Sequence, residues 1–592
     1  MFSIPWHKLP VPFGLLQLVK FRSALRENNL HDTSQIADTD QLPVPSPSQS
    51  DRHLVARTAD GSYNDLAHPE MGMVGTRFGR NVALQDAVVD EAHLLEPNPR
   101  LISRTLLKRD KFIPATILNL HAASWIQFQT HDWFSHGDNP AGEQPGNSFL
   151  VPPADTENNT AESKDLQVPK TPKDPTRTDD NTPPATFTNR VTHWWDASQL
   201  YGSDEATIDS LRTHNQGKMR IDDSDALPFD EAKGIDAVGF PGSTGSWWVG
   251  LSLLHTLFIK EHNAICDRLQ KHYPDWSDAQ LFDKARLINA ALLAKIHTVE
   301  WTPAILPNPI TQVAMNANWW GLLGRGVKAA TGHIGDGEIL SGIVGSVTDH
   351  HTAPYYLTEE FVSVYRMHPL IPDDVDFYSH DNGESLTSKP FQDIFGRRTR
   401  DFMNAVSIED SLYSFGIQHP GAITLHNYPN FLRALTKEDS LDAFDLAAVD
   451  ILRDRERGVP RYNRFREIVG MGRVKSFEEL TSNPQWAKEL RLIYNGNIDR
   501  VDLMVGLFAE DLPTGFGFSD TAFRVFILMA SRRLKSDRFF TDDYRAEIYT
   551  QFGLDWIDDN SFITVLRRHY PALAPALYGL KNGFQPWRSP KK

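Results

Sequence analysis

The sequence predicts a mainly α protein, folded as a single large helical domain with long loops and little strand. Three observations lead to this prediction. Apolar residues recur at helical spacing over residues 114–134, 247–300 and 520–534. Strand-like alternation of apolar and polar residues is rare. No Gly/Ser-rich linker divides the 592 residues, although chains of this length usually form several domains.

The composition limits the classes of partner and the cellular environment. A net charge of −16 gives no reason to expect nucleic acid or an acidic membrane surface as a partner of the whole chain. Cys266 is the only cysteine, which rules out an internal disulfide and favours a reducing, intracellular compartment. No apolar run reaches about 18 residues, so no transmembrane helix is expected. Prolines interrupt the first residues, which therefore make a poor signal peptide.

We divide the chain into an N-terminal extension (residues 1–60), a main domain (61–580) and a basic tail (581–592) that is expected to fray. Residues 1–30 alternate apolar and basic groups. This pattern is typical of an amphipathic helix lying on a membrane surface, and equally of a helix packed on its own domain. Residues 31–60 are polar and contain three prolines, so we expect a loop.

Three other stretches lack helical periodicity. Residues 138–186 are rich in Pro, Thr, Asp, Asn and Lys, which predicts a polar surface insertion within the main domain. Residues 303–355 are rich in Pro and Gly and are expected to form loops. Residues 373–425 show no clear period and are predicted to be irregular.

The first strong helix is predicted over residues 114–134, with Pro114 at its start. Gln127 and His131 lie four residues apart near its end, which places them on one face. A peroxide site needs a histidine that moves a proton between oxygen atoms and a glutamine that orients the oxygen species. The alternative is a helix end with polar residues, where a histidine suits the helix dipole.

An oxygen-rich string follows at residues 192–198. If this segment is extended, alternate side chains face one side. These side chains are Thr192, Trp194, Asp196 and Ser198. Their oxygens, together with the carbonyls of Thr192 and Trp194, are the kind of ligand that Ca²⁺ prefers, and Asp132 could complete the set. The alternative is that these residues form an ordinary loop that binds no ion.

Two polar residues interrupt apolar helices further along the chain. His297 lies near the end of the helical stretch 247–300 and is either a core histidine with an internal partner or a hydrogen-bond donor to a ligand. Arg533 shares a predicted helix face with Phe526. An arginine on such a face either extends to solvent or awaits an anion.

The segment 359–370 contains Tyr365 and His368 and is predicted to be the end of a helix stopped by Pro369. On a helix, a spacing of three residues places both side chains on one face. A neutral imidazole can hold a metal such as haem iron, and a phenol beside it can be oxidised to a radical. Taken alone, the pair is also compatible with ordinary core or surface packing.

Taken together, three motifs resemble the animal-type haem peroxidase superfamily, which includes mammalian peroxidases, cyclooxygenases and the fatty-acid α-dioxygenases. Gln127, His131 and Asp132 look like the distal helix of that group, with its glutamine, distal histidine and calcium-binding aspartate. Residues 192–198 look like its calcium loop. Tyr365 and His368 look like the cyclooxygenase-type pair of radical tyrosine and proximal haem ligand. The resemblance covers roughly residues 80–560.

Within the superfamily the chain is most similar to α-dioxygenase over residues 295–302, 361–368 and 529–541. This resemblance implies a haem-peroxidase-like fold and insertion of O₂ at C2 of a fatty acid through a tyrosyl radical, giving a 2-hydroperoxy acid. It also implies that His297 and Arg533 hold the substrate carboxylate. The substrate-binding residues would then include Phe526, and Arg532 and Arg538 are the next candidates for the carboxylate.

The resemblance also implies one haem b per chain and a calcium ion. Mammalian peroxidases bind haem covalently through an Asp before the distal histidine and a later Glu-Met pair. Here Thr130 precedes His131, and Trp247 and Trp248 stand where the pair would align, so we expect non-covalent haem. We expect a monomer that uses fatty acid and O₂, with peripheral membrane association through the N-terminal residues. The alternatives are a haem peroxidase that reduces hydrogen peroxide with small donors, or a haem-binding adhesion protein without chemistry.

Overall fold

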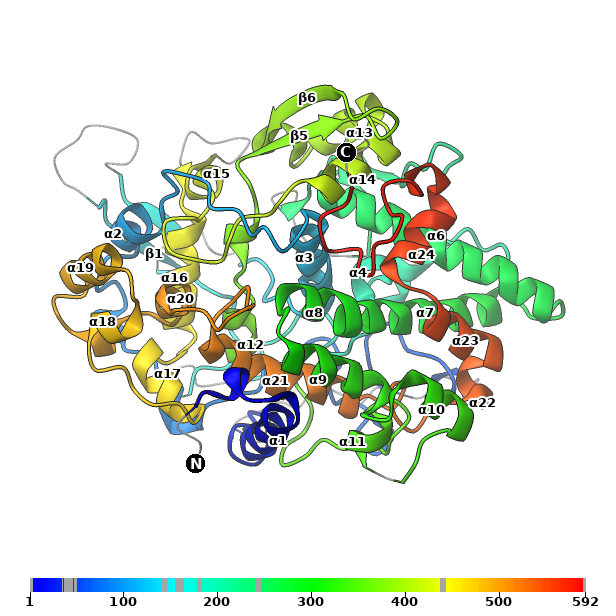
Figure 1. Cartoon of the computed structure of the whole chain (residues 1–592), viewed down its shortest axis with the longest axis horizontal. Helices are drawn as coiled ribbons and strands as arrows, with labels where there is room; N and C mark the ends of the chain where they lie inside the picture. The colour runs from blue at the N-terminus through cyan, green and yellow to red at the C-terminus, as the bar shows by residue number, and fades with distance from the viewer. Residues whose placement is uncertain are drawn as a thin grey trace.

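The computed structural model describes residues 4–34, 36, 46, 51–139, 144, 146–154, 164–177, 184–239, 246–335, 337–436 and 443–588. In this part of the chain helices predominate, and the strands form four antiparallel pairs (Figure 1). The prediction of a mainly α fold is therefore confirmed. One hydrophobic core extends from Trp6 to Trp587, so the N-terminal extension and the last helices share it with the rest of the protein.

Three helices form the centre of the molecule: α3 (His121–Trp133), α6 (Val249–His272) and α7 (Asp278–Ile296). Helix α6 packs against both α3 and α7, and the three helices are apolar on most sides, as expected for largely buried helices. Helix α7 begins with a reciprocal capping box between Ser277 and Gln280. It continues into a π-helical turn, η8 (His297–Trp301), and the short α8 (Thr302–Ile305).

Two further helices cover this centre: α12 (Glu359–Val364) and α21 (Asp520–Lys535). Each begins at a side-chain cap, Thr358 for α12 and Ser519 for α21. The two helices pack against each other. The predicted helix start near Asp520 is confirmed.

The remaining elements connect and surround these helices. The other helices are α1 (Val11–Asn28), α2 (Pro99–Ile102), α4 (Ser198–Tyr201), α5 (Glu205–Leu211), α9 (Pro309–Trp320), α10 (Gly324–Thr331), α11 (Glu338–Ser341), α13 (Arg398–Ala405), α14 (Ile408–Ile417), α15 (Asn430–Arg433), α16 (Leu446–Glu456), α17 (Tyr462–Ile468), α18 (Phe477–Leu480), α19 (Pro484–Ile493), α20 (Leu503–Ala509), α22 (Ala546–Tyr549), α23 (Gln551–Asp559) and α24 (Phe562–His569). The strand pairs are β1 (Ser148–Val151) with β2 (Leu166–Pro169), β3 (Phe229–Asp230) with β4 (Ile235–Asp236), β5 (Asp374–Tyr378) with β6 (Ser385–Pro390), and β7 (Leu435–Thr436) with β8 (Ala443–Phe444).

Several predicted boundaries were wrong. Helix α3 begins at His121 and not at Pro114, because Pro114 forms a bridge with Gly421 in an extended backbone. Residues 303–355 form α9, α10 and α11, since Asn308 caps α9 and Pro309 occupies its first turn. Residues 373–425 contain the β5–β6 hairpin and helices α13 and α14.

The described residues of the polar insertion at 138–186 include two strands, β1 and β2. Its β1–β2 hairpin buries Val151, Leu166 and Val168 against α16. The basic tail does not fray at its beginning either, because Trp587 is buried and its backbone N–H donates to the Gly416 carbonyl at 2.8 Å. Residues 589–592 lie outside the described residues, as do residues 35, 37–45 and 47–50 of the loop predicted over 31–60.

The N-terminal helix α1 packs on its own domain, against α21 and α9. Trp6, just before α1, stacks on Phe523 with ring centroids 5.1 Å apart. Arg22 and Arg26 place guanidinium nitrogens 2.7 and 2.6 Å from Glu338 Oε1. Burial alone would raise the pKa of Glu338, but the two arginines outweigh it and lower that pKa to about 2.

Glu338→Gln is expected to loosen α1 and to lower the melting temperature by a few degrees. The lowering of the Glu338 pKa from 4.5 to about 2 corresponds to about 3 kcal/mol of unfolding free energy at neutral pH. A carboxyl group whose pKa is lowered by folding stabilises the folded protein at pH values above its unfolded-state pKa. This contribution is therefore lost as pH falls from about 4.5 towards 2. Thermal unfolding across this pH range checks the prediction. Glu27→Gln, at an exposed position of α1, is the control. Equal changes of melting temperature in the two variants at pH 7 would contradict the prediction.

Candidate active site

Tyr365 and His368 do not share a helix. Helix α12 ends at Val364, Tyr365 is its C-terminal cap, and His368 begins a separate 3₁₀ turn (His368–Leu370). Pro369 lies inside that turn, so it does not stop the helix as predicted. The backbone between the two residues is held by a hydrogen bond from Met367 N–H to the Tyr365 carbonyl at 2.8 Å.

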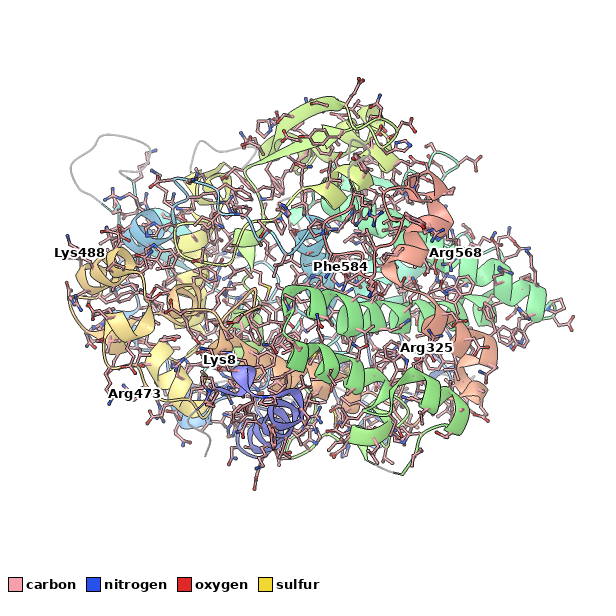
Figure 2. All side chains as sticks on the ribbon, viewed as in Figure 1. Lys8, Arg325, Arg473, Lys488, Arg568 and Phe584 are labelled. Atoms are coloured by element: carbon pink, nitrogen blue, oxygen red, sulfur yellow. The ribbon has the colours of Figure 1, made fainter. Side chains whose placement is uncertain are left out.

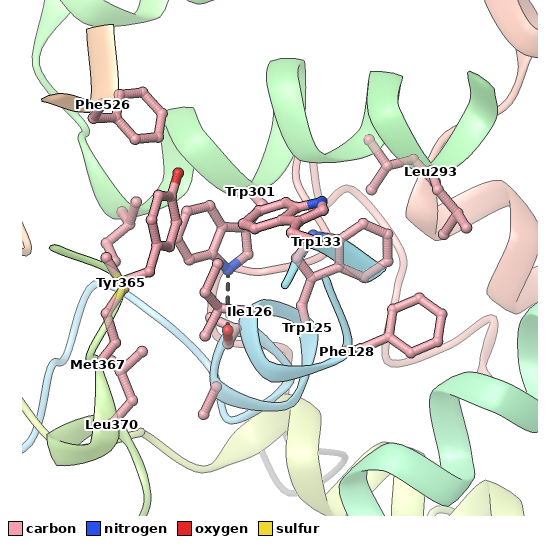
Figure 3. Packing of buried hydrophobic residues seen from close by; sticks show 14 of the residues in the cluster. Trp125, Ile126, Phe128, Trp133, Leu293, Trp301, Tyr365, Met367, Leu370 and Phe526 are labelled. Carbon is pink, nitrogen blue, oxygen red and sulfur yellow. Dashed lines mark hydrogen bonds between the residues drawn. The ribbon is translucent and has the colours of Figure 1, made fainter. Parts of the chain in front are cut away.

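The Tyr365 side chain is buried in an aromatic cluster (Figure 3). Its ring centroid lies 4.6 Å from that of Phe361, 5.2 Å from Trp133 and 6.3 Å from Phe526. Figure 3 shows the hydroxyl on the side of Phe526. That hydroxyl has no hydrogen-bond partner among the described residues. Burial raises the pKa of Tyr365, so the phenol keeps its proton at neutral pH.

His368 is held by a carboxylate that the sequence did not single out. Its Nδ1 lies 2.8 Å from Asp450 Oδ2 on α16. Asp450 also accepts hydrogen bonds from Arg366 Nη1 at 2.6 Å and from the Tyr428 hydroxyl at 2.9 Å. Burial opposes ionisation of Asp450, but His368 and Arg366 outweigh it and lower its pKa to about 2. A carboxylate on Nδ1 orients an imidazole so that Nε2 is available to a metal.

His131 lies on α3 and is almost fully buried. Burial, with a smaller effect of His255 on α6, lowers the pKa of His131 to about 3, so its imidazole is neutral at neutral pH. His255 was not singled out from the sequence; its Nδ1 lies 2.8 Å from the Leu251 carbonyl.

Gln127, one turn before His131, is fixed by the segment that precedes α6. Its Oε1 accepts a hydrogen bond from Trp248 Nε1 at 2.8 Å, and its Nε2 donates to the Ser246 carbonyl at 3.0 Å. The side chain is therefore oriented by both of its amide groups.

Arg533 is a fully buried cation that forms no ion pair with any of the described residues. The guanidinium carbon lies 3.8 Å from the ring centroid of Trp133 and 4.0 Å from that of Trp195. None of its three nitrogens makes a hydrogen bond within the described part of the chain. Burial lowers the pKa of Arg533, which is the sign of a charge held in a poorly solvated place. Cation–π contacts compensate only part of the lost hydration.

His297 lies beside the same two indole rings. Its ring centroid is 5.3 Å from both Trp133 and Trp195, and the ring stacks on Trp301 at 4.7 Å. Its Nδ1 accepts a hydrogen bond from Trp125 Nε1 at 3.2 Å. Since an indole only donates, Nδ1 carries no proton and Nε2 is a donor, which has no partner among the described residues. Burial and Arg533 lower the pKa of His297 well below its usual value.

The neighbouring arginines differ from Arg533. Arg532 Nη2 donates to the carbonyls of Ala353 and Pro354 at 2.6 and 2.7 Å. Arg538 is paired with Asp543 and donates to the His53 carbonyl at 2.5 Å. Of the three arginines considered from the sequence, Arg533 is the one in which none of the three nitrogens has a hydrogen-bond partner among the described residues.

The predicted calcium residues meet around α4. Asp132 Oδ1 accepts hydrogen bonds from the Ser198 backbone N–H at 2.5 Å and from its hydroxyl at 2.9 Å. The segment is not extended as predicted, because Ala197 adopts φ 62° and the chain turns there. Thr192, Trp194, Asp196 and Ser198 are all buried.

Two buried carboxylates among the predicted calcium residues, Asp132 and Asp196, are not fully neutralised by nearby cations. Burial raises the pKa of both Asp132 and Asp196, and the charge of Asp196 adds to the effect on Asp132. Asp132 Oδ2 has no hydrogen-bond partner among the described residues. Arg286 Nη2 lies 3.4 Å from Asp196 and supplies a partial counter-charge. In the described chain no three His, Cys, Asp or Glu side chains gather as metal ligands.

Comparison with known proteins identifies the family of this chain. The family model described as "Animal haem peroxidase" matches residues 56–577. An alpha-dioxygenase of Oryza sativa is 37% identical over 98% of this chain and 93% of its own length, and alpha-dioxygenase 1 of Arabidopsis thaliana is 37% identical over 99% and 91%.

Solved structures agree with the sequence comparison. The crystal structure of the fatty acid alpha-dioxygenase of Oryza sativa superposes with a TM-score of 0.89 at 36% identity, covering 99% of this chain and 94% of that one. A tyrosine-to-phenylalanine variant of the same enzyme with palmitic acid gives 0.90 at 36% identity, covering 99% and 95%. The resemblance found in the sequence is therefore confirmed, and the chain belongs to the animal haem peroxidase family, in its alpha-dioxygenase group.

Proposed function

We propose that this protein is a haem-dependent fatty-acid α-dioxygenase, which inserts O₂ at C2 of a fatty acid and gives a 2-hydroperoxy acid. The similarity to alpha-dioxygenases over nearly the whole chain supports this proposal, as does the palmitic acid complex of the rice relative. The observation that carries it is the guanidinium of Arg533, which has no hydrogen-bond partner among the described residues and is buried with His297 around Trp133 and Trp195. A carboxylate there would supply the missing anion.

Residues of the chain fit a haem. His368, with Nδ1 2.8 Å from Asp450 Oδ2, would hold the haem iron through Nε2. We expect a peroxide to start the reaction. His131 would move the proton of this peroxide, because the His131 imidazole is neutral and buried, and Gln127 would orient the oxygen species. We expect one non-covalent haem b per chain. When bound, the haem supplies the oxidising power that removes a hydrogen atom from Tyr365.

The chain's own residues then direct the reaction. Arg533 and His297 hold the carboxylate, and C2 is the first carbon beyond it. Phe526, 6.3 Å from the Tyr365 ring, would contact the alkyl chain beside this carbon. The Tyr365 radical takes one hydrogen atom from C2, O₂ adds to the carbon radical, and the peroxyl radical takes the hydrogen atom back from Tyr365. The burial of Tyr365 excludes water from these steps.

We further propose a calcium ion at Asp132, Thr192, Trp194, Asp196 and Ser198. Two buried carboxylates and the unpartnered Asp132 Oδ2 support a cation there. The remaining oxygens would come from the hydroxyls of Thr192 and Ser198 and from the carbonyls of Thr192 and Trp194. Metal analysis of the purified protein before and after chelation checks this assignment.

No helix in the described residues is long and apolar enough to cross a membrane. We propose an intracellular monomer that associates with membranes peripherally and uses O₂ and a fatty acid. The single thiol, Cys266, is buried and burial raises its pKa, so it is a poor candidate for a disulfide to a partner.

Asp450→Asn is expected to keep the fold but to weaken haem binding by about tenfold, because a neutral amide orients and polarises His368 less well. Haem titration measures the affinity, and resonance Raman spectra of the ferrous protein report the iron–histidine stretch, which should move to lower frequency.

Asp454→Asn is the matched control for this prediction. Asp454 contacts Arg366 at 3.1 Å and Ser363 at 2.8 Å, and it lies on the same helix as Asp450. The iron–histidine band of this control should have the same frequency as that of the unmodified protein. Identical spectra for both variants would show that Asp450 does not act through His368.

A further inference from the structure

An oxidisable indole lies against the tyrosine that would carry the radical. Tyr365 contacts the rings of Phe361, Phe526 and Trp133. The two phenyl rings are hard to oxidise, whereas an indole is oxidised about as readily as a phenol. The ring centroids of Trp133 and Tyr365 are 5.2 Å apart, which is close enough for direct electron transfer between the two rings. A radical formed on Tyr365 therefore has a competing site beside it.

A second indole extends this path away from Tyr365. Trp195 lies beside Trp133, with ring centroids 5.7 Å apart. The residue before it, Trp194, stacks on Tyr355 with centroids 4.5 Å apart. Electron transfer along these rings would carry the oxidising equivalent away from the fatty acid and would damage the protein.

This loss would be a redox exchange between the two side chains. An electron leaves Trp133 and reduces the Tyr365 radical, and the phenol oxygen takes back the proton that it had released. The products are an intact Tyr365 and an indole that lacks one electron. That indole is a radical cation unless its N–H gives a proton to a base.

Neither indole has a base on its N–H in the described part of the chain. Trp133 Nε1 is buried there without a hydrogen-bond partner. Trp195 Nε1 donates to Gln129 Oε1 at 2.8 Å, and an amide oxygen is a poor proton acceptor. Oxidation of either indole would therefore create a buried positive charge.

A buried cation already faces both indoles. The guanidinium carbon of Arg533 lies 3.8 Å from the ring centroid of Trp133 and 4.0 Å from that of Trp195. It would repel a second positive charge on either ring, and such repulsion is strong in poorly solvated surroundings. The Tyr365 radical is neutral, as is the phenol from which it forms, so the guanidinium affects its formation far less. Asp132 influences the pKa of Arg533, but burial raises the pKa of Asp132, so this carboxyl group offsets the guanidinium charge only in part.

Another arginine that lies over an indole differs in its charge balance. Arg568 on α24 (Figure 2) places its guanidinium carbon 4.3 Å from the ring centroid of Trp556. Arg568 Nη1 also lies 2.6 Å from Glu261 Oε1, so a carboxylate neutralises the guanidinium. Arg533 has no such partner among the described residues, and its charge is left to act on the rings beside it.

We infer that Arg533 confines the radical to Tyr365 by opposing the oxidation of Trp133 and Trp195. This role rests on the proposed function, because it concerns the radical that would attack the fatty acid. The protection is strongest in the substrate-free protein, where a radical has nothing to react with and no carboxylate offsets the guanidinium. When a carboxylate binds, it offsets the charge of Arg533, but the substrate then lies beside Tyr365 and can react.

Electron paramagnetic resonance of the full-length, haem-loaded protein tests this role. Hydrogen peroxide is added without fatty acid, samples are frozen at successive times, and ring-deuterated tyrosine identifies the tyrosyl signal. Arg533→Met should shorten the lifetime of this signal by at least about tenfold. Mass spectrometry of its peptides should find oxidised Trp133. Arg533→Lys should keep most of the lifetime, because an ammonium group retains the charge.

Two variants separate the charge of Arg533 from other effects of the substitution. Arg533→Met/Trp133→Phe lacks the oxidisable ring beside Tyr365 and should regain the long lifetime. Arg568→Met removes the neutralised arginine from Trp556 and is the matched control, with an unchanged lifetime. Equal lifetimes in Arg533→Met and the unmodified protein would overturn the inference. Equally short lifetimes in Arg533→Met and Arg533→Lys, or no recovery in the double variant, would also overturn it.

Haem-loaded Tyr365→Phe protein separates this role from the proposed function. There a ruthenium photosensitiser with persulfate withdraws the electrons in place of the tyrosyl radical. Trp133 should be oxidised at least about tenfold more slowly in Tyr365→Phe than in Tyr365→Phe/Arg533→Met. Equal rates would contradict the protection by Arg533 even if Tyr365 carries a radical. Absence of a tyrosyl signal from the unmodified protein would count against the proposed mechanism and leave this comparison of rates standing.

Discussion

Replacing Tyr365 by phenylalanine is expected to lower fatty-acid oxygenation by at least about a thousandfold while haem binding and the fold are retained, since the hydrogen-transfer step has no substitute group. The substitution keeps the ring contacts with Phe361, Trp133 and Phe526. It also removes a buried hydroxyl without a hydrogen-bond partner among the described residues, so it should not destabilise the protein. Oxygen uptake, the Soret band and the melting temperature measure the three properties.

Tyr544→Phe is the matched control for this substitution. The Tyr544 hydroxyl is also buried without a hydrogen-bond partner in the described chain, but it lies against Trp319 and Tyr549. This variant should keep full activity. Normal oxygen uptake by Tyr365→Phe with palmitate would remove Tyr365 from the mechanism.

Arg533→Met is expected to reduce kcat/KM for a fatty acid by two to three orders of magnitude, chiefly through a higher KM, because truncating one partner of a buried charge pair costs about 2–5 kcal/mol. The same change should raise the melting temperature of the substrate-free protein. The guanidinium is buried there and has no hydrogen-bond partner in the described part of the chain, and burying an uncompensated charge is costly. Arg533→Lys should have a kcat/KM between those of Arg533→Met and the unmodified protein. An ammonium group keeps the charge but cannot lie flat between Trp133 and Trp195 as a guanidinium does.

Arg532→Met distinguishes this role from a structural one. Arg532 donates to two backbone carbonyls, so its loss should lower the melting temperature and leave KM unchanged. A substrate-free Arg533→Met protein that is less stable than the unmodified protein, with unchanged KM, would contradict the assignment of Arg533 to the carboxylate.

The sequence predicted the chemical groups better than their local geometry. Buried helices such as α7 were clear because their apolar residues recur over many turns. Short elements are hard to predict where a local signal has two meanings: the prolines in 303–355 predict loops, but Pro309 lies at the start of α9. Pro369 predicts the end of a helix, but that helix ends earlier, at Val364.

Contacts between distant segments could not be predicted at all. The indoles of Trp133 and Trp195 enclose Arg533, and Asp450 holds His368, yet these residues belong to five separate segments of the chain. Spacing within one helix carries no information on which helices meet. The motifs around Tyr365 and Arg533 were nevertheless recognisable, because the resemblance to a family supplied the long-range arrangement that periodicity lacks.

The dioxygenase function is tested most directly by oxygen consumption of the purified, haem-loaded protein with palmitate and no added electron donor, with the products identified by mass spectrometry. The protein should take up O₂ and form 2-hydroperoxypalmitate, with the aldehyde one carbon shorter as a decay product. Peroxide reduction with small donors, but no oxygen uptake with palmitate or with fatty acids of other chain lengths, would contradict it and identify a peroxidase.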